Sequence, residues 1–254
     1  MNGQEEVDAY KASLAPAPAA EEAAAPAAEE AAALSPTKKG YVYGFFDLKD
    51  MEEFKNVYSP MAEPTLEPYG GKFVIKYPIP PPMAQKMGVP ESKTFGKTGM
   101  MAFMLQFDDF DKAMGWFTGP EYAAVIEKRD QVADFNMVVV EGSEIKPGAG
   151  LVVGFFDLKD PKEFKEVYSP MAEPTLAPYG GSFMIKHAIA PPMAEKMGMK
   201  VTKSTGTTGQ MAFVLQFDDF DKATGWFTGP EYAGVIEKRD QVADFNMAVV
   251  GAMK

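Results

Sequence analysis

Short apolar runs recur along the first half of the chain, and each run is followed within two residues by an aspartate, a proline or a glycine. Residues 41–48, 72–79 and 135–140 are rich in aromatic and β-branched side chains, which favour strands. The run at residues 100–107 (MMAFMLQF) is apolar on both faces, so we expect it to be covered on both sides of a sheet. The pattern therefore predicts four strands.

Apolar positions three and four residues apart predict a helix after the first strand. Asp50 is suited to cap its N-terminus, and Glu53 would complete a capping box. The expected inward face consists of Phe54, Val57, Tyr58 and Met61. Pro60 and Pro64 should break or kink this helix, because proline lacks the N–H donor. A short second turn then leads to the glycine pair at residues 70–71, which ends the helical region.

A second helical region follows the third strand, and Asp108 or Asp109 is suited to cap it. Its expected inward face consists of Phe110, Ala113, Met114 and Phe117. Residues 118–121 (TGPE) resemble a second capping box. The inward positions after it are Tyr122, Val125 and Ile126. The predicted order of elements is thus β-α-β-β-α-β.

The whole pattern occurs twice. Residues 41–142 recur as residues 151–252 at a constant offset of 110, without a gap and with about three-quarters identity. This period is too long for a solenoid repeat, so each copy is expected to be a domain. The linker, residues 143–150, is short enough that the two domains must be neighbours. We therefore predict a first repeat at 41–142 and a second at 151–254.

Composition narrows the possible functions. Residues 1–40 are dominated between 15 and 33 by Ala, Pro and Glu, so we expect a disordered tail. The net charge of −11 argues against nucleic-acid binding, and no apolar run is long enough to span a membrane. There is no cysteine, and the N-terminus does not resemble a secretory signal. We expect an intracellular protein, most simply a cytoplasmic one, with an organelle lumen left open.

Several polar and aromatic residues are identical in the two copies and are candidates for a ligand site. Trp, Tyr and Arg side chains can line a pocket between sheet and helices, with Arg129 holding a carboxylate or enolate. The alternative is structural, with Tyr69 and Trp116 as core aromatics, Glu121 as a helix cap and Arg129 paired with Asp130 or Glu121. The candidate ligand-binding residues are Tyr58, Tyr69, Trp116, Tyr122, Arg129, Tyr168, Tyr179, His187, Trp226, Tyr232 and Arg239.

His187 is the only histidine, and Tyr77 takes its place in the first copy. Two equivalent sites therefore cannot both use a histidine base or a histidine metal ligand, which leaves one asymmetric site or an ordinary strand residue. The acidic residues 108–111 (DDFD) lack calcium-loop spacing and are better suited to capping a helix. No phosphate-binding glycine loop occurs. We therefore predict no metal, no cofactor and no assigned catalytic residue.

The chain has 18 methionines, several of them in or beside the proline-rich loop between Pro80 and Gly99. Flexible thioethers suit adaptable apolar surfaces, so this loop and its equivalent between Pro191 and Gly209 could dock a protein partner or form a lid. The alternative is a short amphipathic turn that covers the end of its own domain.

The residues PTLxxYGGxF (64–73) and AxxWF…PEY…R (113–129) resemble the family called domain of unknown function 1330. That family belongs to the ferredoxin-like proteins that form dimeric α/β barrels. Its members usually pair as homodimers with their sheets face to face. The resemblance implies an α+β fold in which the two repeats pair within one chain, which would then be a monomer. The loop after Pro80 is longer than the family pattern, and the family's own function is uncharacterised.

Three functions follow from these observations. The first is binding of a small apolar or aromatic molecule without catalysis. The second, by analogy with superfamily members, is a cofactor-independent enzyme similar to monooxygenases or isomerases. The third is a structural or assembly protein that docks a larger complex through its Pro/Met-rich loops and acidic tail.

Overall fold

The computed structural model describes residues 38–254. The predicted tail therefore lies outside the described residues, except for residues 38–40, and Lys39 and Gly40 already belong to the first strand. No helix among the described residues is both long and apolar enough to cross a membrane.

The first repeat has the predicted order of elements, with a short helix and a two-residue strand added before the third long strand. Its strands are β1 (Lys39–Leu48), β2 (Lys72–Pro78), β3 (Thr94–Phe95), β4 (Met101–Phe107) and β5 (Ala133–Gly142). Its helical segments are α3 (Met51–Glu53), η1 (Phe54–Tyr58), α4 (Ser59–Ala62), η2 (Glu63–Tyr69), α5 (Pro81–Met87), α6 (Phe110–Thr118) and α7 (Pro120–Val132). The four long strands agree with the predicted ranges to within about two residues at each end.

The second repeat follows the same order. Its strands are β6 (Gly150–Leu158), β7 (Ser182–Ala188), β8 (Ser204–Thr205), β9 (Met211–Phe217) and β10 (Ala243–Gly251). Its helical segments are α8 (Pro161–Glu163), η3 (Phe164–Tyr168), α9 (Ser169–Ala172), η4 (Glu173–Tyr179), α10 (Pro191–Lys196), α11 (Phe220–Thr228), α12 (Pro230–Ala233) and α13 (Ile236–Val242). Helix α7 is continuous, whereas its equivalent breaks into α12 and α13 at Gly234, where the first repeat has the better helix former Ala124.

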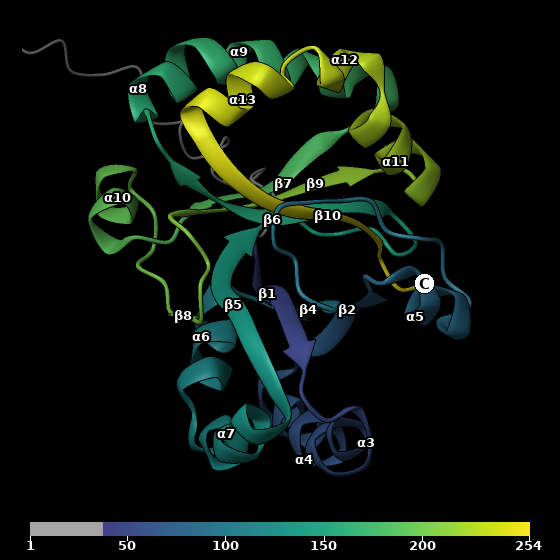
Figure 1. Cartoon of the computed structure of the whole chain (residues 1–254). Coiled ribbons are helices and arrows are strands. Elements are labelled where there is room, and N and C mark those ends of the chain that lie inside the picture. Colours follow the sequence, from purple (N-terminus) through teal and green to yellow (C-terminus); the bar gives the residue numbers. More distant parts are fainter. Residues whose placement is uncertain (1–37) are drawn as a thin grey trace, which may run out of the picture. The chain divides into compact units, whose positions relative to one another are not determined.

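Each repeat forms an antiparallel sheet with the ferredoxin-like strand order. The orders are β2-β4-β1-β5-β8 in the first sheet and β3-β10-β6-β9-β7 in the second. The fifth strand of each sheet comes from the other repeat, and Figure 1 shows β8 beside β5. The edge strands β5 and β10, which would otherwise offer unpaired backbone groups, are thereby paired at two residues each, Met137 and Val138 in β5 and Met247 and Ala248 in β10.

The two sheets close into one α/β barrel within the chain. A β-bulge at Val74 interrupts the pairing of β2 with β4, and the Val74 carbonyl accepts a 2.8 Å hydrogen bond from the Met253 N–H of the second repeat. The Met184 carbonyl likewise accepts from the Ser143 N–H at 3.0 Å. Bulges at barrel rims commonly redirect the backbone in this way. The predicted pairing of the repeats within one chain is confirmed.

Side chains of both repeats fill the barrel interior in one shared hydrophobic cluster. Tyr43 is fully buried there and donates its hydroxyl to the Gly154 carbonyl of the second repeat at 2.9 Å. Its ring stacks on Phe155 with centroids 5.1 Å apart. Because this core belongs to both repeats, neither repeat buries its inner face alone.

Two further clusters, one for each repeat, lie between the outer face of the sheet and its helices. Figure 1 shows α8, α9, α12 and α13 gathered on one side of the second sheet. The third long strand of each repeat, β4 or β9, is therefore covered on both faces, as its apolar sequence predicted.

The first helical region differs from its prediction. Residues 54–58 form a π-turn in which the Ser59 N–H bonds to the Phe54 carbonyl, and the helical region continues past Pro60 to Ala62. The predicted second turn towards Tyr69 is present as a 3₁₀ helix over residues 63–69. The π-turn shifts the inward face to Phe54, Tyr58, Ala62 and Leu66. Met61, predicted to be inward, is 44% exposed.

Two predicted capping boxes are incomplete. Asp50 and Asp109 cap their helices as expected, each accepting from a backbone N–H three residues later. The carboxylate of Glu53, however, pairs with Lys128 rather than returning to Asp50. At residues 118–121 no side chain caps the helix, and Glu121 instead accepts a 2.7 Å hydrogen bond from Tyr69.

The loop after α5 crosses to the second repeat, which the sequence did not predict. Val249 donates its N–H to the Lys93 carbonyl at 2.8 Å, and Ser92 donates its hydroxyl to the Val249 carbonyl at 2.7 Å. Gly96 has a φ of +71°, and a Cβ there would lie 2.2 Å from the Phe245 carbonyl oxygen. The loop of the second repeat makes the equivalent contacts with Val139.

Candidate functional site

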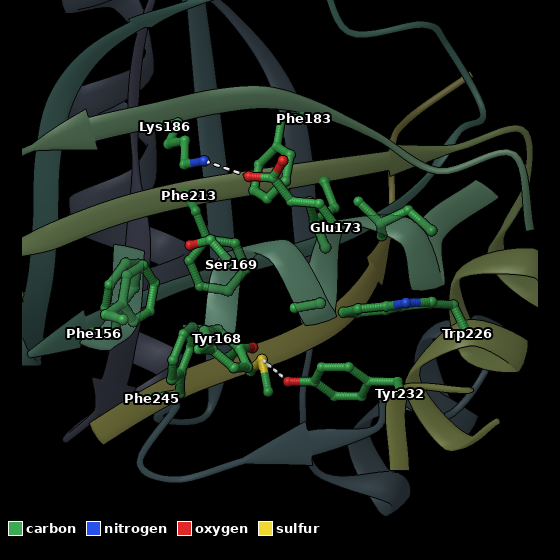
Figure 2. Close-up of a pocket in the computed structure, with 15 residues that line it drawn as sticks. Phe156, Tyr168, Ser169, Glu173, Phe183, Lys186, Phe213, Trp226, Tyr232 and Phe245 are labelled. Carbon is green, nitrogen blue, oxygen red and sulfur yellow. Dashed lines mark hydrogen bonds and ion pairs between the residues drawn. The ribbon is translucent and has the colours of Figure 1, made fainter. Parts of the chain in front are cut away.

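Each repeat has a pocket between its first helical region and the outer face of its sheet. In the first repeat the pocket has a volume of about 540 Å³ and continues to α5. In the second repeat the equivalent pocket encloses about 60 Å³ (Figure 2). Small-molecule pockets usually measure about 300–1,000 Å³, so the first pocket is large enough for such a ligand, whereas the second must open before it can hold one.

Aromatic rings form most of the pocket wall. The Phe46 and Phe135 rings, from β1 and β5, are 4.5 Å apart, and the Phe54 ring of the helical region lies 5.1 Å from Phe46. On another side, the Trp116 ring of α6 is 4.1 Å from the Tyr122 ring of α7. In Figure 2 the equivalent Trp226 and Tyr232 lie on one side of the second pocket, opposite Phe156. Such walls favour flat apolar molecules.

An ion pair lies at the mouth of the pocket. Phe73 and Lys76 both line the pocket although they are three residues apart on a strand, because the bulge at Val74 adds one residue between them. Lys76 pairs with Glu63 of the helical region at 2.7 Å, and both side chains are 40–49% exposed. Exposed pairs contribute little stability. This contact can therefore separate at small cost to admit a ligand.

The polar end of the pocket is formed by two tyrosines backed by an arginine. Arg129 is 4% exposed and donates to the Tyr122 hydroxyl oxygen at 2.9 Å. The same guanidinium donates to Asp130 at 2.8 Å, and Asp130 is exposed at the surface. The Tyr122 hydroxyl in turn lies beside Tyr58, which lines the pocket.

Both tyrosine hydroxyls remain protonated at neutral pH. Burial raises the pKa of Tyr58 far above its usual value, and the neighbouring Tyr122 raises it further. Burial also raises the pKa of Tyr122, although the charge of Arg129 opposes that shift. Tyr168 and Tyr232 of the second repeat show the same directions for the same causes. The pocket therefore presents neutral hydroxyl donors rather than phenolates.

The walls of the two pockets are the same. All 15 residues that line the second pocket have an identical residue in the first repeat, and each of these also lines the first pocket. The first pocket is larger and also includes residues towards α5, among them Met83 and Met87. The shared lining is Phe46, Phe54, Tyr58, Ser59, Ala62, Glu63, Leu66, Phe73, Lys76, Phe103, Leu105, Trp116, Tyr122, Phe135 and Met137.

Residues 39–143 and residues 149–253 each match the sequence profile of the domain of unknown function DUF1330. The chain belongs to the DUF1330 family. It carries two DUF1330 domains in tandem, which agrees with the resemblance seen in its sequence motifs. No protein with curated annotation matches the chain.

Several solved structures are similar to the chain at low identity. A candidate monooxygenase of Fusobacterium nucleatum subsp. nucleatum is 14% identical, with 87% of this chain and 94% of that chain covered and a TM-score of 0.43. A candidate monooxygenase of Lactobacillus acidophilus is 12% identical, covering 85% and 98%, with a TM-score of 0.39. A haem-binding protein of Thermus thermophilus is 9% identical, covering 86% and 94%, with a TM-score of 0.40. We carry no ligand or reaction over from them.

Six of the eleven candidate residues of the DUF1330 tandem line the pockets. They are Tyr58, Trp116 and Tyr122 in the first repeat and Tyr168, Trp226 and Tyr232 in the second. Arg129 and Arg239 lie behind the second tyrosine of each pocket and do not line it. The Trp116 indole N–H donates to Thr65 at 2.9 Å, so the ring is held in one orientation.

The other three candidates lie elsewhere. Tyr69 and Tyr179 are on the outside of the helical layer, where their hydroxyls donate to Glu121 and Glu231 at 2.7 Å. His187 is buried on the barrel side of β7, where its Nε2 lies 3.1 Å from the Lys200 carbonyl and its ring stacks on Phe110. Burial lowers the pKa of His187.

Sequence reasoning did not single out most of the aromatic wall. Phe103 and Leu105 alternate along β4, and Phe135 and Met137 alternate along β5, so each pair shares the outer face of its strand. This alternation with a period of two was the sequence signal from which the pocket wall could have been predicted. Among residues 38–254, no group of three or more histidines and carboxylates is placed to hold a metal ion.

Proposed function

We propose that the protein binds a small, largely apolar aromatic molecule in its outer pockets, without catalysing a reaction on it. The observation that carries this proposal is the identity of the pocket walls in the two repeats. About a quarter of all equivalent positions differ between the repeats, yet none of the 15 shared lining positions does.

The barrel interior provides the internal comparison. It is as deeply buried as the pocket walls, but many of its equivalent positions have diverged. The divergent interior pairs are Tyr41/Leu151, Tyr43/Val153, Val74/Met184, Tyr77/His187, Met104/Val214 and Val138/Ala248. Burial alone therefore does not keep the two repeats the same. The remaining buried residues of the first repeat's outer cluster are also identical in the second repeat, including Phe107 and Val125, which do not line the pocket, so packing of the helices on the sheet contributes to this identity. A shared ligand would impose the same walls on the lining positions of both repeats.

The chemistry of the lining supports binding rather than catalysis. Among the described residues, Glu63 is the only carboxylate that lines the first pocket, and it is paired with Lys76 at the mouth. The tyrosines are held protonated by burial, so they are donors and not bases. General base catalysis requires an unprotonated group near the reacting atom. A binding role needs only the shape and the donors that are present.

A cofactor-independent enzyme is the second candidate, favoured by the contact of Arg129 with Tyr122, because a polarised hydroxyl can stabilise charge on a substrate oxygen. Mass spectrometry of candidate ligands after incubation with the protein separates the two functions. Unchanged ligands support binding, and a product with a new mass supports catalysis.

The remaining proposals concern partners and location. Two loops, residues 80–99 and residues 191–209, each pair through a short strand with the opposite repeat. A protein partner would have to bind the loop residues that remain exposed outside these strands. We retain a monomeric chain in the cytoplasm as the simplest proposal. Light scattering of the purified chain tests the monomer.

The binding proposal is tested by filling the pocket. Ala62 and its equivalent Ala172 line the two pockets, whereas Met61 and Met171 on the same helical turn are 44% exposed. The variant Ala62→Phe/Ala172→Phe should abolish binding of the neutral probe N-phenyl-1-naphthylamine, read as a change in tryptophan fluorescence. The matched control, Met61→Phe/Met171→Phe, should bind as the wild type does. Equal binding by both variants would disprove the pocket as the site.

A further inference from the structure

We infer that the ligand of the first pocket carries one anionic group, such as a carboxylate, which Lys55 and Lys86 bind while the aromatic body of the ligand lies between the pocket walls. This inference rests on the proposed function and adds the chemical class of the ligand. The two lysines are called the cationic edge of the pocket below.

The residues that distinguish the first pocket from the second carry the argument. The first pocket has eight lining residues beyond the shared wall, and the two charged ones among them are lysines. Lys55 belongs to η1 and Lys86 to α5, so the cationic edge is built from two separate elements. The other six residues are apolar, namely Leu48, Met51, Met83, Met87, Met101 and Ala102. The added part of the pocket is therefore apolar with two positive charges.

The cationic edge is available for a ligand. The third lysine of the lining, Lys76, is paired with Glu63 at 2.7 Å. Lys55 and Lys86, by contrast, form no ion pair with any of residues 38–254. The charged residues that line the pocket thus carry a net charge of +2, in a chain whose net charge is −11. An anion repelled by most of the surface is attracted here.

The exposure of the two lysines determines the shape of the ligand. Both residues are exposed, and a lysine can line an apolar pocket with its methylene stem while its ammonium group remains in water. An anionic group beside them keeps part of its hydration, so it avoids the cost of burying a charge. The aromatic wall begins directly next to Lys55, at Phe54. An aromatic body with an anionic group at one end matches both parts of the pocket.

The buried arginine does not bind this anion. Arg129 lies behind Tyr122, does not line the pocket and is paired with Asp130 at 2.7 Å. A carboxylate at that end of the pocket would lose its water without meeting the guanidinium directly. The cationic edge is therefore the place in the pocket where an anionic group is stabilised.

The second repeat provides the comparison. Its equivalent lysines, Lys165 and Lys196, are also exposed, but they do not line the second pocket. The charged residues that line that pocket are Lys186 and Glu173, which pair with each other at 2.8 Å (Figure 2). The lining of the second pocket therefore has no net charge. Binding of the anionic group is expected in the first pocket and not in the second.

Two fluorescent probes with the same aromatic body test this inference. N-phenyl-1-naphthylamine is neutral, and 8-anilinonaphthalene-1-sulfonate is the same molecule with an added sulfonate. We expect Lys55→Gln/Lys86→Gln to raise the dissociation constant of the sulfonate about 3- to 10-fold, the effect of two exposed charge pairs. Binding of the neutral probe should stay as in the wild type, which also shows that the variant is folded. The matched control, Lys165→Gln/Lys196→Gln, should bind both probes as the wild type does.

The variant Ala62→Phe shows whether the sulfonate occupies the pocket, because it fills the first pocket and leaves the lysines in place. It should abolish the effect of the lysine substitutions. If that effect persisted, the lysines would bind the probe on the surface and the inference would be wrong. Equal affinity of the wild type and Lys55→Gln/Lys86→Gln for the sulfonate would also overturn it, while binding of the neutral probe would leave the proposed function intact. If the wild type bound neither probe, both would fail together.

Discussion

The Phe95 ring of the first repeat lies 3.8 Å from the Arg239 guanidinium of the second repeat. The equivalent of Phe95 in the second repeat is Thr205, so Arg129 has no matching ring from the opposite loop. The two loops thus cross between the repeats in the same way but cover the two arginines differently.

We predict that Phe95→Thr lowers the free energy of unfolding by about 1 kcal/mol, because an aromatic ring over a cation contributes about 0.5–2 kcal/mol. The reciprocal change, Thr205→Phe, should be neutral or stabilising. Urea denaturation of both variants checks this. Equal destabilisation by the two changes would show that the contact with Arg239 is not the cause.

His187 should make stability depend on pH. Burial lowers the pKa of His187 below its ordinary value of 6.5, while the Lys200 carbonyl and Glu141 oppose the shift and Lys38 adds to it. The unfolded chain therefore binds a proton more readily than the folded chain. Since the unfolded state then holds more protons, stability falls as the pH falls from about 6.5 towards the lower folded pKa.

The first repeat offers the matched variant, because Tyr77 occupies the equivalent position. Since His187 is the only histidine, His187→Tyr should remove the loss of stability between about pH 7 and pH 5.5. The free energy of unfolding at several pH values measures it. If the free energy of unfolding fell equally with pH in the variant and the wild type, His187 would not be the cause of the pH dependence.

The shared barrel core should make the two repeats unfold together. Tyr43 donates to the carbonyls of Gly154 and Phe213 in the second repeat, at 2.9 and 3.2 Å. We expect Tyr43→Phe to cost about 1–3 kcal/mol, because buried carbonyls lose their donor. Circular dichroism and the fluorescence of Trp226, read with Trp116 replaced by phenylalanine in both proteins, should report one transition. If the first repeat unfolded separately in Tyr43→Phe while the transition reported by Trp226 stayed at its wild-type position, this prediction would be contradicted.

Much of the fold could be predicted from sequence because its determinants are local. The strands follow from apolar runs, and Asp50 and Asp109 cap the helices because their side chains reach the N–H three residues later. The repeat and the short linker predicted two neighbouring domains, and the resemblance to the DUF1330 family implied their pairing. These signals need no knowledge of distant contacts.

The parts that were missed depend on long-range contacts or on a change of helical period. The π-turn at residues 54–58 alters the spacing, so Met61 took the place of Ala62 in the predicted face. The loop that crosses to β10 pairs through backbone groups, which carry little sequence signal. The burial of Arg129 depends on Tyr122 and Phe135, which only the folded chain brings around it.

The central claim is that the outer pocket of the first repeat is a ligand site. A crystal structure of the full chain with N-phenyl-1-naphthylamine tests this most directly. We predict density for the aromatic rings of the probe between Trp116 and the helical region. Density in the barrel interior or only on the surface, with the outer pocket empty, would contradict the account.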